Sequence, residues 1–196
     1  MKSVAGLVYA GGESSRFGAD KATALLQGQR LIDHVNARLE PQVCALAVAG
    51  PVTLNDAACL DDGAHSGKGP LAGLFAGLTW AANLPDVTWL VTAPCDVPLL
   101  PKNLVALLTH NTNNIPMVLT VDGRWQTGCA LWPTSVRAAI EEILIKEEDL
   151  SLHAALKQLQ ADIIEARADV LEGSFVNINT QDDLTQLEQR LRHANG

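Results

Sequence analysis

Two cations and a run of glycines follow the first apolar stretch of this sequence. Residues 4–9 are apolar enough for a buried β-strand, and Gly11 and Gly12 come just behind them. Glycines at this point let the backbone turn sharply and bring its N–H groups close to a ligand. Arg16 and Lys21 lie a few residues further on. Backbone donors and two cations at the end of a strand suit a polyphosphate, so this loop predicts a nucleotide site.

A carboxylate stands at the end of another strongly apolar run. Asp96 follows residues 87–92 and lies between Pro94 and Pro98, which restrict the turn. Mg²⁺ typically takes one or two carboxylates together with substrate phosphates and water. Asp96 is therefore a candidate metal ligand, and a helix cap or an ordinary loop aspartate is the alternative that its position leaves open.

Two asparagines near the C-terminus are a further candidate pair. Asn177 and Asn179 fall on the same side of a strand predicted over residues 175–178, because side chains alternate with a period of two. An asparagine oxygen can bind Mg²⁺, and its amide can contact a phosphate. Asparagines before a helix also cap it or brace a turn, and both interpretations stay open.

The segment that begins at Gly69 predicts the start of a helix. Pro70 suits the first helical position, and the free N–H groups of that turn can meet a phosphate. Gly73 and Gly77 recur on the same helix face, where either packing or binding would explain them. Asp62 ends a short strand and could contact a ribose or a metal, or be solvated. The glycines fit neither a Walker A sequence nor a Rossmann fingerprint.

The order of the predicted elements indicates the fold class. Strand-like runs alternate with helix-like ones, which predicts an α/β fold with a doubly wound, mostly parallel sheet in a single domain over residues 1–196. Strands are predicted at 4–9, 43–49, 87–92, 117–121, 125–132 and 175–178. Helices are predicted at 31–39, 71–82, 102–109, 133–147, 151–159 and 180–193, the last of these opening with a capping box.

Composition narrows the class of protein. The chain has 196 residues, is 47% hydrophobic and carries a formal net charge of −8, so its surface as a whole will not attract nucleic acid. No run approaches the roughly 18 apolar residues that span a bilayer. The 4 cysteines are scattered, which argues against a zinc site or a disulfide framework and favours a reducing compartment. We therefore expect a cytoplasmic protein that binds neither nucleic acid nor membrane.

Four blocks of this sequence, in order, resemble one enzyme family. They are Ala10-Gly-Gly-Glu-Ser-Ser-Arg-Phe-Gly-Ala-Asp-Lys-Ala22, Gly-Pro-Leu-Ala-Gly73, Pro-Cys-Asp-Val-Pro98 and Phe-Val-Asn-Ile-Asn-Thr180. The chain is similar to the nucleotidyltransferases that make the dinucleotide form of the molybdenum cofactor. The Gly-Gly and Asp-Lys forms in the first block favour the guanylyl-transferring branch over the cytidylyl-transferring one.

The resemblance implies roles for individual residues. It implies nucleotide contacts at Tyr9, Ala10, Gly11, Gly12, Lys21 and Asp62. It implies catalytic roles for Arg16, Lys21 and Asp96, with Mg²⁺ at Asp96. It implies that Arg16, Gly69, Asn177 and Asn179 line the path to the molybdopterin phosphate. The chain departs from the family at Tyr9, where leucine is usual, after residue 48, where an asparagine is often found, and at residues 123–129, which lack a proline.

The implied reaction transfers GMP from GTP to molybdopterin and releases pyrophosphate. The attacking group is a phosphate monoester, already anionic near neutral pH, so no base is needed to activate it. GTP and molybdopterin are the implied partners, with transient contact to molybdoenzymes or their chaperones. The alternatives are a cytidylyltransferase or sugar-phosphate nucleotidyltransferase of the same fold, and a non-catalytic nucleotide- or cofactor-binding protein.

Overall fold

A seven-stranded sheet in the order β5-β4-β1-β6-β8-β7-β9 forms the centre of the molecule. The computed structural model describes residues 3–11, 21–109, 113–146, 148–166 and 174–194. The strands are β1 (Ser3–Tyr9), β4 (Ala45–Ala49), β5 (Ala58–Leu60), β6 (Val87–Pro94), β7 (Met117–Val121), β8 (Arg124–Pro133) and β9 (Asp162–Glu165). Within these ranges β8 pairs antiparallel with β6 and β7, and the other pairs are parallel. The predicted mostly parallel α/β sheet is confirmed.

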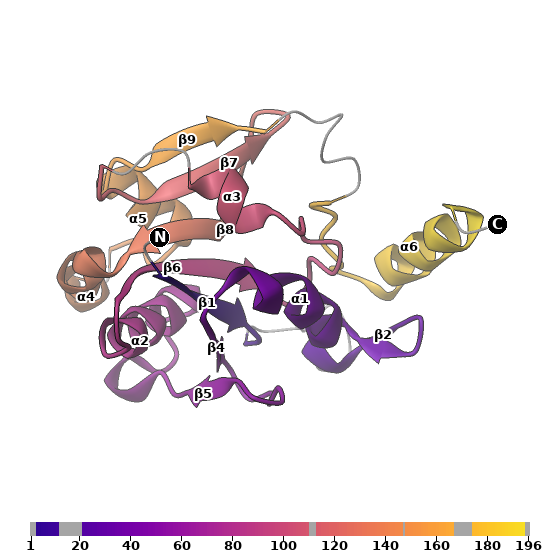
Figure 1. The fold of residues 1–196 in the computed structure, drawn as a ribbon, viewed down its shortest axis with the longest axis horizontal. Coiled ribbons are helices and arrows are strands. Elements are labelled where there is room, and N and C mark those ends of the chain that lie inside the picture. Colours follow the sequence, from indigo (N-terminus) through magenta and orange to yellow (C-terminus); the bar gives the residue numbers. More distant parts are fainter. Residues whose placement is uncertain (1–2, 12–20, 110–112, 147, 167–173, 195–196) are drawn as a thin grey trace.

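Helices cover both faces of this sheet (Figure 1). One apolar core joins the sheet to α1 (Leu31–Leu39) and α3 (Leu104–Leu108). A second core joins the opposite face to α2 (Pro70–Ala82), α4 (Arg137–Lys146) and α5 (Leu152–Gln158). Within β1, Val8 belongs to the first core, whereas Leu7 and Tyr9 belong to the second. A strand buried on both faces therefore needs an unbroken apolar run, which is what made β1 predictable.

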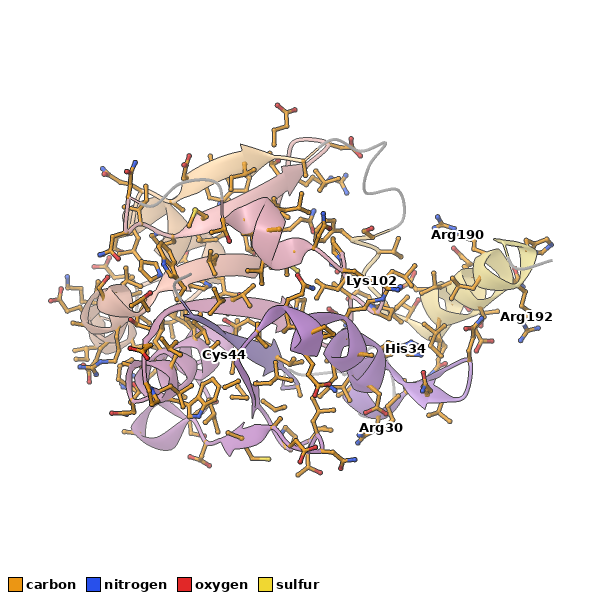
Figure 2. The ribbon with its side chains drawn as sticks, viewed as in Figure 1. Arg30, His34, Cys44, Lys102, Arg190 and Arg192 are labelled. Atoms are coloured by element: carbon orange, nitrogen blue, oxygen red, sulfur yellow. The ribbon has the colours of Figure 1, made fainter. Side chains whose placement is uncertain are left out.

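The C-terminal helix α6 (Gln181–Ala194) extends away from the sheet, beside the hairpin formed by β2 (Leu25–Leu26) and β3 (Gln29–Arg30) (Figure 1). A third apolar cluster holds it there; its buried members are Leu26, Leu31, Ile178, Leu184 and Leu187. The hairpin is also tied to α1, because His34 Nε2 donates to Leu26 O at 2.8 Å (Figure 2). The capping box predicted for α6 is present and is described with the site.

Several predicted elements need correction. Residues 175–178 do not form a strand: Ile178 N donates to Asp96 O at 2.9 Å, and its side chain packs with α6 instead of entering the sheet. The helix predicted over 133–147 begins only at Arg137, because Pro133 ends β8 and a 3₁₀ turn, Thr134–Val136, follows it. Residue 147 lies outside the described ranges. The half-polar edge strand β9 was not predicted.

Two glycines of α2 allow this helix to lie close to the sheet. A Cβ at Gly73 would lie 3.0 Å from Ala49 Cβ, and one at Gly77 would lie 2.6 Å from Leu7 Cδ2 and 3.0 Å from Leu90 Cδ2. All three distances are shorter than ordinary carbon–carbon contacts. Packing therefore explains Gly77; Gly73 is packed closely as well but also lines a cavity, so both of its interpretations stay open. Among the described helices, none has the length and apolar composition needed to cross a membrane.

We expect Gly77→Ala to lower the free energy of unfolding by about 1–3 kcal/mol, because the new methyl group overpacks the α2–sheet contact. On an unhindered helix the same change would raise stability by about 1 kcal/mol. The sign of the change therefore separates close packing from helix propensity. Chemical denaturation of the two proteins measures it, and a stabilised variant would contradict the packing argument.

Candidate active site

The carboxyl ends of β1, β4 and β6 meet at one edge of the sheet. Tyr9, the last residue of β1, lies opposite Ala49 of β4 and Pro94 of β6. Backbone bonds continue one step further, from Ala10 N to Ala49 O at 2.8 Å and from Cys95 N to Tyr9 O at 2.9 Å. These bonds fix the starting direction of the loops that carry Gly11 and Asp96. Ligands of open α/β sheets bind at such edges.

An ammonium group joins three distant segments at this edge. Lys21 Nζ donates to Asp96 Oδ2 at 2.8 Å and to Asn179 Oδ1 at 2.9 Å. The Lys21 and Asp96 side chains are 20% and 19% exposed, so both charges are largely withdrawn from water. Charge-assisted bonds offset the cost of removing such groups from solvent. The structure thus brings together three of the residues that the sequence singled out.

The capping box of α6 holds Asn179 in place. Asp183 Oδ2 accepts bonds from Asn179 N at 2.9 Å and from Thr180 N at 2.8 Å, and Asp183 N donates to Thr180 Oγ1 at 3.1 Å. Because backbone N–H groups bind its charged form, the pKa of Asp183 lies below its ordinary 3.8. A helix cap therefore orients the asparagine that contacts the catalytic candidate Lys21.

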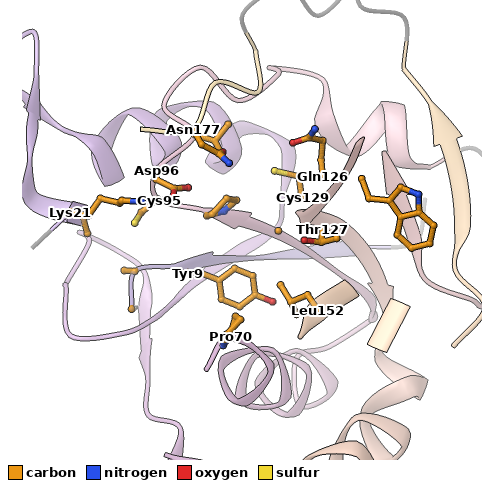
Figure 3. Close-up of a pocket in the computed structure, with 17 residues that line it drawn as sticks. Tyr9, Lys21, Pro70, Cys95, Asp96, Gln126, Thr127, Cys129, Leu152 and Asn177 are labelled. Carbon is orange, nitrogen blue, oxygen red and sulfur yellow. Dashed lines mark hydrogen bonds and ion pairs between the residues drawn. The ribbon is translucent and has the colours of Figure 1, made fainter. Parts of the chain in front are cut away.

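A cavity of about 450 Å³ opens beside the Lys21–Asp96 pair (Figure 3). Asn177 lines it, as do the end of β1 and the β8 residues 125–129. In Figure 3 the labelled Lys21 and Asp96 lie at one end, and Gln126, Thr127 and Leu152 lie toward the other. One end of this cavity thus carries charge, while the other presents an amide, a hydroxyl and an apolar side chain.

A second cavity of about 490 Å³ lies on the other side of Tyr9. It contains Asp62 and Gly69, and it shares Tyr9, Gly11 and Pro70 with the first cavity. Burial, with the charge of Asp61 as a smaller cause, raises the pKa of Asp62 above its ordinary 3.8. Gly69 thus lies with Asp62, whereas the resemblance placed it with Asn177. The two cavities meet at the glycine loop.

Gly50 is a residue of this site that sequence reasoning missed. It lines the second cavity and has a φ of +131°. A Cβ there would lie 2.6 Å from both Ala10 C and Gly11 N, which are backbone atoms that cannot move aside. The glycine therefore lets the end of β4 pass directly under the glycine loop. The pair Gly50-Pro51, directly after the strand predicted at residues 43–49, was the feature of the sequence that could have indicated this position.

Two buried titratable groups of the first cavity, Cys129 and Tyr9, are held neutral. Burial, and to a smaller extent the charge of Asp96, raises the pKa of the Cys129 thiol above its ordinary value. Burial likewise raises the pKa of Tyr9, with the neighbouring Thr92 opposing the change. Neither group is a nucleophile or base in this state. Within the described ranges, no group of three or more His, Cys, Asp or Glu side chains is placed to bind a metal.

The other predicted residues are distributed as follows. Ala10 lines the first cavity and Gly11 lines both. Gly12 and Arg16 lie outside the residues that the structure describes. Among the cavity residues that sequence reasoning did not assign to a site are Gly50, Trp125, Gln126, Thr127 and Leu152. Residues 123–129 depart from the family pattern, and this departure could have indicated that Trp125, Gln126 and Thr127 of β8 belong to a site.

The fold and the polar groups at this sheet edge define a nucleotidyltransferase type of protein. Residues 6–163 match the family model described as the MobA-like NTP transferase domain. The chain therefore belongs to the family of MobA-like NTP transferases, and the resemblance seen in the sequence is confirmed.

Curated relatives refine this assignment. The chain is 35% identical over 195 residues to a molybdenum cofactor guanylyltransferase of Rhizobium leguminosarum, covering 96% of this chain and 93% of the relative. It is 36% identical over 191 residues to the enzyme of the same name from Acidiphilium cryptum, covering 93% and 92%. Both relatives support the branch of the family that the first sequence block favoured.

Solved structures confirm the fold. A molybdopterin-guanine dinucleotide biosynthesis protein A from Archaeoglobus fulgidus matches with a TM-score of 0.76 at 21% identity, over 96% of this chain and 99% of the other. A 4-diphosphocytidyl-2C-methyl-D-erythritol synthase from Anaerococcus prevotii matches with a TM-score of 0.70 at 13% identity, over 97% and 96%. At these identities the likeness concerns the fold alone.

We expect Asp183→Asn to be less thermally stable than the parent protein at neutral pH, because the charged cap accepts two backbone bonds. The folded-state pKa of Asp183 is depressed, so this stabilisation is present above its ordinary 3.8 and is lost as pH falls through the lower folded value. The gap between the two melting temperatures should therefore close in acid. Asp182→Asn, in the same helical turn, is the matched control, and a gap that does not change with pH would contradict the argument.

Proposed function

We propose that this protein transfers GMP from GTP to molybdopterin, with release of pyrophosphate. The observation that carries the proposal is the Lys21 ammonium, bound between Asp96 and Asn179 beside the loop where two cavities meet. Two adjoining cavities, the first of which contains the Lys21 ammonium, suit two substrates that each bring a phosphate to one point. The names of the curated relatives support the choice of substrates.

The second cavity suits the nucleoside part of GTP. Asp62 offers a carboxylate for a ribose hydroxyl or a base edge, and the glycine-lined wall at Gly50 and Gly69 allows close approach of a flat ligand. Gly11 lines this cavity and also the first cavity, which contains Lys21. The triphosphate would then lie along backbone N–H donors and end at the ammonium.

Asp96 and Asn179 would hold Mg²⁺. Their oxygens converge on one cation in the structure, at 2.8 and 2.9 Å from Lys21 Nζ. One carboxylate, an amide oxygen and substrate phosphates are a donor set that Mg²⁺ accepts. When bound, the metal supplies charge neutralisation on the phosphate oxygens.

The protein itself contributes position and charge. The acceptor phosphate is already anionic, so the neutral Cys129 and Tyr9 are not required as bases. Lys21 exchanges its bonds to Asp96 and Asn179 for bonds to the triphosphate. The two cavities hold the reacting phosphates near each other, which lowers the entropic part of the barrier.

The cellular context follows from the same proposal. A finished dinucleotide cofactor is used inside other enzymes, so transient contact with molybdoenzymes or their chaperones is expected at release. No disulfide joins the described cysteines, which supports a place in the reducing cytoplasm.

We expect Lys21→Ala and Asp96→Ala each to lower turnover with GTP and Mo-molybdopterin at least about tenfold, or 1.4 kcal/mol of barrier. In Mg²⁺ buffer, calorimetry with GTP, CTP, ATP and UTP should show selective GTP binding that Lys21→Ala weakens. Lys146→Ala, which removes a solvent-exposed lysine of α4, is the control.

Each other result has a defined meaning. Preference for CTP would move the protein to the cytidylyl-transferring alternative. Folded protein that binds no nucleotide would support the non-catalytic alternative. Turnover close to the parent value in both variants would reject the proposed roles of Lys21 and Asp96.

We expect Lys21→Met to bind Mn²⁺ about tenfold more tightly than the parent protein in the absence of nucleotide. The parent must first break a charged hydrogen bond worth about 1.5 kcal/mol to free Asp96. Electron paramagnetic resonance of free and bound Mn²⁺ measures the difference. Lys146→Met should leave the affinity unchanged, Asp96→Asn should abolish binding, and equal affinities in Lys21→Met and the parent would show that Lys21 and the metal do not compete.

A further inference from the structure

The part of the first cavity farthest from Lys21 has no role in the reaction described so far. Its wall comes from β8, where Trp125, Gln126, Thr127 and Gly128 line the cavity, and from Leu152 of α5. A phosphate needs none of these groups. They offer an indole ring, an amide and a hydroxyl, which suit a flat ligand with a polar edge.

An irregularity in the sheet lies next to Trp125, in the part of β8 that lines the cavity. Val118 of β7 pairs with Ala130, but Thr120 pairs with Trp125, so β8 carries extra residues between these two pairs. On its other side β8 pairs with β6 only through residues 131–133 among the described pairs. Residues 126–129 therefore leave both ladders. Bulges next to active sites re-aim side chains in this way.

The indole of Trp125 is braced from outside the sheet. It is partly buried, and its ring centroid lies 4.8 Å from that of His153 on α5, with the planes tilted by 49°. The start of α5 is itself fixed, because Ser151 Oγ accepts from Ala154 N at 3.1 Å. A ring held on one side loses little further freedom when a ligand stacks on it.

We propose that Trp125 stacks on the planar ring system of the acceptor, a pterin-type heterocycle, and that Gln126 and Thr127 bind its polar edge. The acceptor phosphate then reaches the Lys21–Asp96 end of the same cavity. A volume of about 450 Å³ is in the range of small-molecule sites. Aromatic stacking is the usual way in which proteins hold flat heterocycles. The inference rests on the proposed function for the identity of the acceptor.

The first experiment measures binding of pterin itself, without phosphate, by calorimetry and by quenching of tryptophan fluorescence. We expect Trp125→Leu to weaken pterin binding at least about tenfold and Trp125→Phe to retain most of it, because phenylalanine keeps an aromatic face. GTP affinity should stay unchanged in both variants. Trp80→Leu, on α2 and outside the cavity lining, is the matched control.

The second experiment follows guanylyl transfer to Mo-molybdopterin. Trp125→Leu should raise the KM for the acceptor about tenfold with little change in kcat, and Trp125→Phe should restore the parent value. A merely structural role would instead lower the melting temperature of the variant and would alter GTP binding as well.

The outcomes separate this inference from the proposed function. If GTP binding and transfer are intact but Trp125→Leu binds pterin like the parent, the ring site is wrong. If guanosine, and not pterin, quenches Trp125 and competes for the cavity, the cavity holds the nucleobase and the inference is overturned. If GTP is not used but pterin binding still depends on Trp125, the ring site stands and the proposed function fails.

Discussion

The contact of the Lys21 ammonium with Asp96 and Asn179 is the interaction on which the site depends. It joins the segment behind the glycine loop, the end of β6 and the entry to α6, with bonds of 2.8 and 2.9 Å. An ammonium that is four-fifths withdrawn from water is costly without anionic or polar partners. The three segments are therefore held together until another anion offers Lys21 equivalent bonds, which is the property expected of a site that receives polyphosphate.

The sheet edge that carries this contact depends on small residues. Gly50 lets β4 pass under the backbone of residues 10 and 11, and Gly73 lets α2 lie against Tyr9 and Ala49. With the backbone this close, Tyr9 becomes a wall between two cavities and does not fill either one. The separation of the two cavities therefore depends on the close packing at Gly50 and Gly73 as well as on the residues that line the cavities.

Local sequence patterns predicted those helices and strands whose formation depends on their own apolar pattern and capping residues. The apolar run of β1 and the segment Trp89–Val91 of β6 reflect burial on both faces, and the helix Leu31–Leu39 has the bounds expected from the sequence. The sequence pattern gave wrong elements where contacts with residues far along the chain determine the structure. The segment around Ile178 looks like a strand but packs with α6, and β9 is too polar to stand out although β7 provides it with a partner. Lys21, Asp96 and Asn179 were each singled out from the sequence, whereas their contact, Gly50 and the β8 bulge depend on register and loop packing that a sequence does not display.

The neutrality of two buried groups, Cys129 and Tyr9, limits the chemistry that they can perform. Burial keeps the Cys129 thiol and the Tyr9 hydroxyl protonated, so neither accepts a proton from a substrate alcohol. An acceptor hydroxyl would find no activated base among these groups, but a phosphate monoester brings its own charge. Such a substrate needs a cation and a fixed direction of approach, and the Lys21–Asp96 end of the first cavity offers both. Among the described groups, the neutral Cys129 and Tyr9 therefore favour phosphate over hydroxyl as the attacking group.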